Sequence, residues 1–128
     1  MTREIKFFKT YFIDFYISLN SSVQEKIEYV FNVIKTVDRI PEKFLKHLEG
    51  TDGLFEIRVQ LRSDIYRIFC CFDAGRIVIL FNGFQKKSQK TPKDEINKAI
   101  RLKEEYFKEK RGGKSWKLLK TQNHSMNF

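Results

Sequence analysis

The sequence predicts a small α+β fold in which helices pack on an antiparallel sheet, with its elements in the order β-α-α-β-β-β-α. Three observations predict this fold. Residues 21–37 carry apolar side chains at helical spacing, residues 54–62 alternate apolar and polar side chains, and residues 63–84 hold two more apolar runs separated by turn residues. At 128 residues, the chain is long enough for one domain with one modest core.

The amino-terminal third predicts a short strand followed by two helices. The strand covers residues 4–8, "EIKFF", and a brief helix follows it. The apolar residues that predict this brief helix are Phe8, Phe12, Phe15 and Leu19. The second helix covers residues 21–37, where Ser22 and Glu25 match a capping box. Its apolar stripe consists of Val23, Ile27, Val30, Ile34 and Val37.

A meander of three strands is predicted after Gly53. In the first strand, residues 54–62, the side chains expected to face the core are Phe55, Ile57, Val59 and Leu61. Those expected to face solvent are Glu56, Arg58, Gln60 and Arg62. Turns at residues 63–64 and 73–75 lead into two further strands, "IYRIFCCF" and "RIVILFNGF", and we expect neighbouring strands to pair antiparallel.

The last predicted element is a helix that packs on the sheet. Thr91 can cap this helix and Pro92 can open it. The residues expected to share one face of the helix are Ile96, Ala99, Ile100, Lys103, Tyr106 and Phe107. We expect residues 1–110 to form the domain and residues 111–128 to be a basic carboxyl-terminal extension of unassigned role.

The positive charge is concentrated in one part of the chain. The formal net charge is +9 at pH 7. Residues 1–40 and 41–84 are nearly neutral, whereas residues 85–120 hold thirteen Lys and Arg against five Asp and Glu. A localised basic region attracts polyanions, so the charge favours a nucleic acid as partner. The alternative is that the lysines serve only solubility.

The composition argues against a membrane protein and against a secreted one. No apolar run approaches the length of a membrane-spanning helix, and the amino terminus, "MTREIKFFKTYF", lacks the features of a secretory signal. We therefore expect a cytoplasmic protein. Cys70 and Cys71 are adjacent in a predicted strand, where side chains point to opposite faces, so neither a disulfide nor a metal pair is favoured.

Three segments resemble those of a known protein family. They are "LEGTDGLFEIRV", "YRIFCCF" and "ILFNGFQKKSQKTPKDEINKAIRLKEEY". The third is the most specific, because it combines a strand, a Phe-x-Lys-Lys-x-x-x-x-Pro exit and a closing helix. Over residues 1–110 the chain is similar to the RelE/HigB superfamily of bacterial toxin-antitoxin modules, and specifically to its HigB-like, phage-associated branch.

The resemblance implies a toxin that enters the ribosomal A site and cuts mRNA, and that a cognate antitoxin protein holds inactive. RNA can be cleaved without a metal, because its 2′-hydroxyl attacks the adjacent phosphate and leaves a cyclic phosphate. The protein must help to move protons and to stabilise the added negative charge. The sequence contains no metal-binding cluster and no phosphate loop, so we expect no metal and no small-molecule cofactor.

Basic residues of the predicted meander are the candidates for this chemistry. We assign Arg67 to transition-state stabilisation and Lys87 to proton transfer, because arginine keeps its charge whereas a crowded lysine can lose its proton. The residues expected to bind RNA phosphates are Arg58, Lys86 and Lys90. The alternative for the lysine pair is a solvated strand end.

Two other residues have competing interpretations. Phe84 can stack on an RNA base, or it can belong to the core as apolar strand residues usually do. His47, expected in the loop before the second strand, can approach the basic face as an accessory group, or it can simply be solvated.

Two other functions remain compatible with the same fold. A ParE-like toxin would inhibit DNA gyrase by contact, and a non-catalytic nucleic-acid-binding protein would need only the basic last third of the chain. The lysine pair at the strand exit favours the ribonuclease over the gyrase inhibitor.

Overall fold

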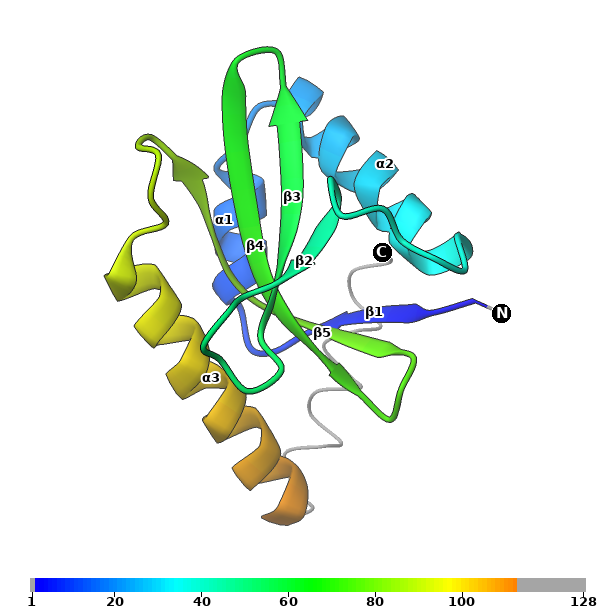
Figure 1. Ribbon diagram of the computed structural model, residues 1–128, viewed down its shortest axis with the longest axis vertical. Coiled ribbons are helices and arrows are strands. Elements are labelled where there is room, and N and C mark those ends of the chain that lie inside the picture. The colour runs from blue at the N-terminus through cyan, green and yellow to red at the C-terminus, as the bar shows by residue number, and fades with distance from the viewer. Residues whose placement is uncertain (1, 113–128) are drawn as a thin grey trace.

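The computed structural model describes residues 2–112, which form a five-stranded sheet covered by helices (Figure 1). The elements are β1 (Glu4–Phe7), α1 (Tyr11–Ile17), α2 (Ser21–Thr36), β2 (Leu45–His47), β3 (Phe55–Leu61), β4 (Asp64–Asp73), β5 (Ile77–Lys86) and α3 (Lys93–Gly112). The strand order in the sheet is β1-β5-β4-β3-β2. The predicted α+β class and the packing of helices on the sheet are confirmed.

The sheet differs from the prediction at both edges. β1 pairs with β5 in parallel, with Glu4 opposite Ile77, so the sheet is mixed and only its other pairs are antiparallel. Hydrophobic periodicity identifies a strand but not its partner, and two helices separate β1 from the meander. β2 is an additional strand, so His47 ends a strand and does not lie in a loop. Three residues are too few to show a period of two.

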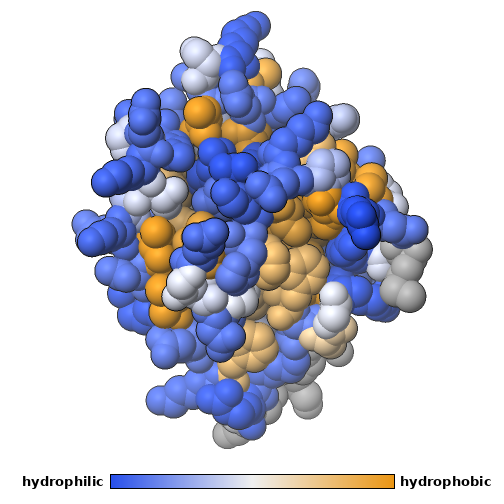
Figure 2. Space-filling view, in the orientation of Figure 1, coloured by the Kyte–Doolittle hydropathy of each residue, from blue (hydrophilic) through white to orange (hydrophobic). Residues whose placement is uncertain are grey.

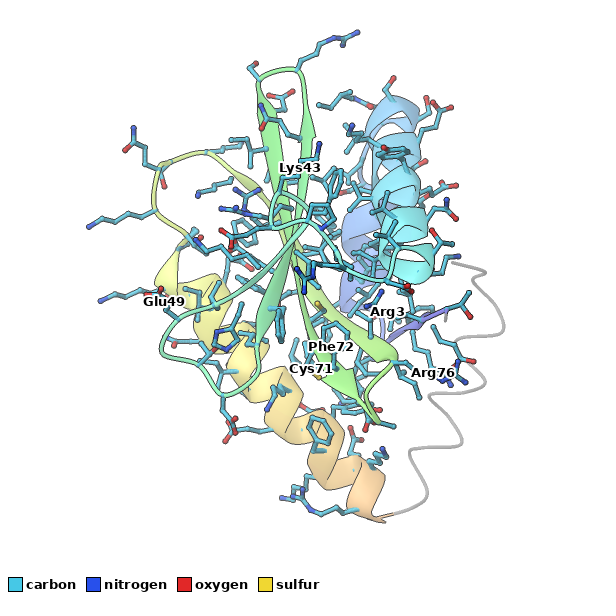
Figure 3. All side chains as sticks on the ribbon, turned by 45° about the vertical axis from the view of Figure 1, so that its right-hand side comes forward. Arg3, Lys43, Glu49, Cys71, Phe72 and Arg76 are labelled. Carbon is cyan, nitrogen blue, oxygen red and sulfur yellow. The ribbon has the colours of Figure 1, made fainter. Side chains whose placement is uncertain are left out.

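Helices on the two faces divide the core into two layers. α1 and α2 pack on one face, where Ile27, Ile57 and Leu80 are buried. α3 packs on the other face with a second buried cluster, and Figure 1 shows it running along one side of the sheet. Cys71 and Phe72, labelled in Figure 3, are consecutive in β4 and pack in different layers, as strand alternation requires.

The amino terminus of α2 is capped by a residue that the sequence analysis did not identify. The side chain of Asn20 accepts a hydrogen bond of 3.0 Å from the Val23 N–H. The helix therefore begins at Ser21, one residue before the predicted cap, and Ser22 lies inside its first turn. Asparagine is among the best N-cap residues. A side chain therefore caps α2, but it is that of Asn20 and not that of Ser22.

Two polar anchors fix α3 to the sheet. Near its start, the Asn82 side chain donates to the backbone oxygen of Glu95 at 3.1 Å and to its carboxylate at 2.9 Å. Towards its end, the Tyr106 hydroxyl donates to Asp73 at 2.5 Å, and Lys110 lies 2.6 Å from the same carboxylate oxygen. Burial opposes ionisation of Asp73, but the bonds from Lys110 and Tyr106 outweigh it and lower the pKa of the carboxyl.

The packing face of α3 is rotated from the predicted one. Its fully buried residues are Ala99, Leu102 and Tyr106, and Leu102 was absent from the prediction. Ile100, which was predicted to pack, is 36% exposed. The helix continues to Gly112, two positions past the predicted boundary, and the predicted extension from residue 113 onward lies outside the described residues.

A β-bulge in β5 decides which side chains share a face of the sheet. Cys70 pairs with Leu80 but Ile68 pairs with Gly83, so two residues of β5, Phe81 and Asn82, oppose one residue of β4. Ahead of the bulge, the odd-numbered residues of β5 face α3. After it, the even-numbered residues do, and Gly83 faces α1 instead.

Gly83 is required by the close approach of α1. A Cβ atom at this position would lie 2.5 Å from Cδ2 of the Phe15 ring. We expect Gly83→Ala to lower the free energy of unfolding by about 1–3 kcal/mol, because α1 must shift to relieve the overlap. The control is Gly112→Ala, where a Cβ meets no atom within 4 Å. Urea denaturation of both variants checks this, and equal midpoints would contradict it.

Candidate functional site

Two rows of cross-strand neighbours cross β3, β4 and β5 beyond the first turn of α3. The first row consists of Arg58, Arg67 and Phe84, and the second consists of Gln60, Ile65 and Lys86. Directly opposed residues of antiparallel strands point to the same face, which here is the α3 side. In Figure 1 this part of the sheet extends past the amino-terminal end of α3. Arg58, Arg67 and Lys86 therefore lie on the same face of the sheet, in adjacent rows.

Glu56 is one residue of this site that sequence reasoning missed. It was predicted to face solvent, but it is only 5% exposed. Its carboxylate oxygen Oε2 accepts a hydrogen bond of 3.0 Å from Nε of Arg58 and lies 3.4 Å from Nε of Arg67. One buried carboxylate therefore sits between the two arginines. The sequence feature that could have identified Glu56 is its position two residues before Arg58, which places both side chains on the same face of the strand.

Arg67 lies at the floor of the site and is 7% exposed. Its Nη1 donates to the backbone oxygen of Tyr66 at 3.2 Å, while its buried Nε makes no hydrogen bond. Burial lowers the pKa of the Arg67 guanidinium, the Glu56 carboxylate counteracts this, and the neighbouring charge of Arg58 lowers it further. This Nε lies 3.4 Å from the Glu56 carboxylate, which is therefore the counter-charge of the buried guanidinium.

The basic surface continues onto β2 through a residue that was not predicted. Lys46 is the direct cross-strand partner of Glu56, so its side chain lies on the same face as the two arginines. Lys46 is half-buried. Because β2 itself was not recognised, the sequence analysis had no means to place this lysine in the sheet.

The remaining predicted residues lie at the exit of β5. Lys86 is half-buried at the strand end, whereas Lys87 and Lys90 are exposed in the segment that leads to α3. Phe84 is half-buried, and its ring lies 5.6 Å from that of the buried Phe69, so it belongs to the edge of the core. The contact with Phe69 agrees with a place in the core, and the partial exposure of Phe84 agrees with stacking on a base.

The structure does not bring His47 to the arginines. His47 pairs with Phe55, and the two rings lie 5.2 Å apart on the side of the sheet that α1 and α2 cover. Arg58 and Arg67 lie on the opposite side. Within residues 2–112, no three His, Cys, Asp or Glu side chains are grouped so that they could hold a metal ion.

A second pair of arginines lies away from this site. Arg3 and Arg76, both labelled in Figure 3, line a pocket of about 270 Å³ together with Asp38. Arg3 donates to the backbone oxygens of Ile34, Val37 and Asp38, so it caps the end of α2. The role of Arg3 is therefore to stabilise the end of α2. We do not count this pocket as part of the site formed by Arg58 and Arg67.

The face of the molecule shown in Figure 2 is mainly hydrophilic. In Figure 2, blue side chains surround apolar side chains that gather near the middle of the view. The large apolar residues that are most exposed are Ile17, Tyr29, Val37 and Ile100. No helix among the described residues is both long enough and apolar enough to cross a membrane.

Comparison with protein families gives a direct match. Residues 14–104 match the family described as phage-derived protein Gp49-like. The chain belongs to this Gp49-like family. It is a family of RelE/HigB-type toxins, so the resemblance that the sequence indicates is confirmed. Family and fold together support a toxin of a toxin-antitoxin module.

Comparison with solved structures agrees with this assignment. The Gp49-like chain is similar to a chain in the crystal structure of the archaeal RelE–RelB complex from Pyrococcus horikoshii OT3. The TM-score is 0.50 at 20% sequence identity, and the match covers 71% of this chain and 100% of that chain. At this identity the likeness concerns the fold, which is RelE-like. A comparison with curated proteins gives no match.

The contact of Glu56 with two arginines predicts a large effect on stability. Glu56→Gln should lower the free energy of unfolding by about 2–4 kcal/mol, because it leaves the buried charge of Arg67 without its carboxylate. The exposed Glu42 provides the control Glu42→Gln. Adding Arg67→Gln to Glu56→Gln should recover part of the loss, since the two residues are coupled. Denaturant titrations measure all three, and a Glu56→Gln variant as stable as the control would refute the contact.

Proposed function

We propose that this Gp49-like protein is a ribosome-dependent mRNA endonuclease, the toxin of a toxin-antitoxin module. The observation that carries the proposal is the row of Arg58 and Arg67, with Lys86 in the next row, on a part of the sheet that α3 leaves uncovered. Guanidinium groups bind phosphate oxygens in a fixed fork geometry, and they keep their charge at neutral pH. A phosphodiester above this row would meet two arginines and a lysine.

The reaction needs only the RNA and these side chains. The ribose 2′-oxygen attacks the adjacent phosphorus and loses its proton, while the bond from phosphorus to the 5′-oxygen breaks and that oxygen gains a proton. We assign the proton transfer to Lys87, which is exposed and lines a pocket with Ile65 and Lys86 of the second row. We assign to Arg67 the stabilisation of the charge that develops on the phosphate. Arg58, Lys86 and Lys90 position neighbouring phosphates.

Glu56 contributes by fixing the arginines. Arg58 and Arg67 are direct cross-strand neighbours, and like charges in this arrangement repel each other. The carboxylate between them offsets the repulsion and restricts the rotamers of both side chains. Because the two arginine side chains are already held in place, they need not move when charge develops in the transition state.

A cognate antitoxin is the second part of the proposal. The similar archaeal structure contains RelE in complex with RelB, which supports a protein partner here. Apolar side chains near the middle of the face in Figure 2 give such a partner surface to bury. With ribosomes as its site of action, the protein would work in the cytoplasm, with residues 1–110 as the active domain.

The roles of Arg67 and Lys87 can be separated by single-turnover cleavage of mRNA on programmed ribosomes. Arg67→Lys keeps a cation beside Glu56 but loses the fork, so it should reduce cleavage by about two orders of magnitude while ribosome binding changes little. Arg67→Ala should reduce it by two to three orders. Lys87→Ala and Lys87→Arg should both cleave mRNA slowly. Alanine has no group that transfers a proton, and arginine cannot accept a proton near neutral pH.

Two lysines provide comparisons for this experiment. Lys86→Ala should weaken binding and make it less dependent on salt, as one lost phosphate contact does. Lys108→Ala, exposed near the far end of α3, should behave as wild type. Full activity of folded Arg67→Ala and Lys87→Ala would remove the proposed active site. If induction instead yields gyrase-linked DNA breaks and no cuts in mRNA, the gyrase inhibitor is the correct function.

The antitoxin can be tested by coexpression. Induction of this gene alone should arrest growth, and coexpression with the product of the neighbouring gene should restore it, since a tight complex blocks the basic surface. The two proteins should copurify. A gene that is harmless alone, with no complex formed, would remove the main support for a toxin.

A further inference from the structure

We propose that the pocket beside Lys86 holds a nucleobase of single-stranded RNA, one nucleotide from the cleaved phosphodiester, and that Gln89 reads its edge. The inference rests on the proposed function, because it needs an RNA bound across the arginine row. It adds to that function the residue that selects where the RNA is cut.

The pocket has a volume of about 570 Å³ and opens at the surface. Its lining consists of Ile65, Lys86, Lys87, Ser88 and Gln89. Ile65, near the start of β4, supplies an apolar wall, the two lysines supply positive charge, and Ser88 and Gln89 supply hydrogen-bonding groups. A phosphate alone would gain nothing from an apolar wall. A nucleotide uses all three kinds of group, because its base is flat and apolar on its faces and polar at its edge.

The position of the pocket matches the path of an RNA strand through the site. Ile65 and Lys86 are cross-strand partners in the second row, and they lie two residues along their strands from Arg67 and Phe84 in the first row. Two residues of a strand span about 6.6–6.8 Å, which is about the length of one extended nucleotide. An RNA whose phosphate contacts Arg67 therefore places a neighbouring nucleotide over Ile65.

The polar groups of the pocket suit recognition of a base edge. The Ser88 hydroxyl donates to the backbone oxygen of Lys90 at 2.9 Å, which shapes this segment and leaves the Ser88 oxygen as an acceptor. Gln89 is exposed, and its side-chain amide offers both a donor and an acceptor. Sequence-specific recognition of RNA uses such groups on the Watson–Crick or Hoogsteen edges of unstacked bases.

The chain contains a matched control for Gln89. Gln85 is also an exposed glutamine, four positions earlier, and it pairs with Tyr66. Tyr66 belongs to the layer under α1 and α2, so Gln85 lies on the opposite face of the sheet from the pocket. Gln89→Ala thus removes a glutamine side chain from the pocket, and Gln85→Ala removes one from the opposite face of the sheet.

The test is to sequence the 5′ ends of mRNA that wild type and both variants cleave on translating ribosomes. Wild type should prefer one base at a single position next to the cut. Gln89→Ala should weaken that preference about five- to tenfold, as expected for loss of one or two hydrogen bonds, while Gln85→Ala should leave it unchanged. Ile65→Ala, with folding confirmed by its melting temperature, should raise KM for all sites and keep the base preference, because every base can pack on an apolar wall.

The outcomes distinguish this inference from the function on which it rests. If wild type cleaves with a base preference and Gln89→Ala retains that preference, the pocket does not read the base, although the endonuclease stands. Cleavage by wild type without any base preference would also overturn the pocket. No cleavage of mRNA by wild type would overturn both.

Discussion

One extra residue in β5 determines the position of every candidate functional side chain on that strand. Strict alternation through "RIVILFNGFQK" would place Phe81 towards α3 and Phe84 and Lys86 towards α1. The bulge puts Phe81 and Asn82 together opposite Phe69 and reverses the alternation after them. Phe84 and Lys86 therefore join the two arginines on the uncovered part of the α3 side. The same bulge turns Asn82 towards the start of α3, where its amide fixes the helix. The bulge thus positions both the part of the site that β5 contributes and the start of α3.

The second constraint is electrostatic. Two arginines that pair directly across a sheet, one of them almost fully buried, would destabilise the fold if no anion were near. Glu56 supplies that anion from within the fold, so the arrangement does not depend on a bound ligand. One carboxylate between Arg58 and Arg67, with Lys46 and Lys86 on the same face, leaves the surface positive overall. The site can therefore remain ordered in the free protein and still attract a polyanion.

The sequence predicted the features that depend on neighbouring residues and missed those that depend on contacts between distant segments. Apolar spacing located the helices and the three long strands, and the Lys-Lys exit of β5 marked the region in which the basic residues meet. Pairing of β1 with β5, the short β2 and the bulge depend on contacts between distant segments, which no periodicity records. The same reason explains Glu56. A charged residue at an alternating position is expected to face solvent, and the contact of Glu56 with Arg67 of the adjacent strand is visible only in the structure. His47 was misplaced because its strand was not recognised.

The candidate site combines residues of central strands with residues of the segment that connects β5 to α3. Arg58 and Arg67 lie in central strands with neighbours on both sides, so their positions are fixed by the sheet. Lys87 and Gln89 lie in the segment between β5 and α3, whose two ends are held by the sheet and by the contact of Asn82 with Glu95. Phosphate chemistry needs precise geometry, which strands supply, whereas the choice of base needs only side chains that can differ without disturbing the core. Under the proposed function, substitutions in this segment would alter where RNA is cut, while the arginine row, and with it the proposed ability to cut, stays unchanged.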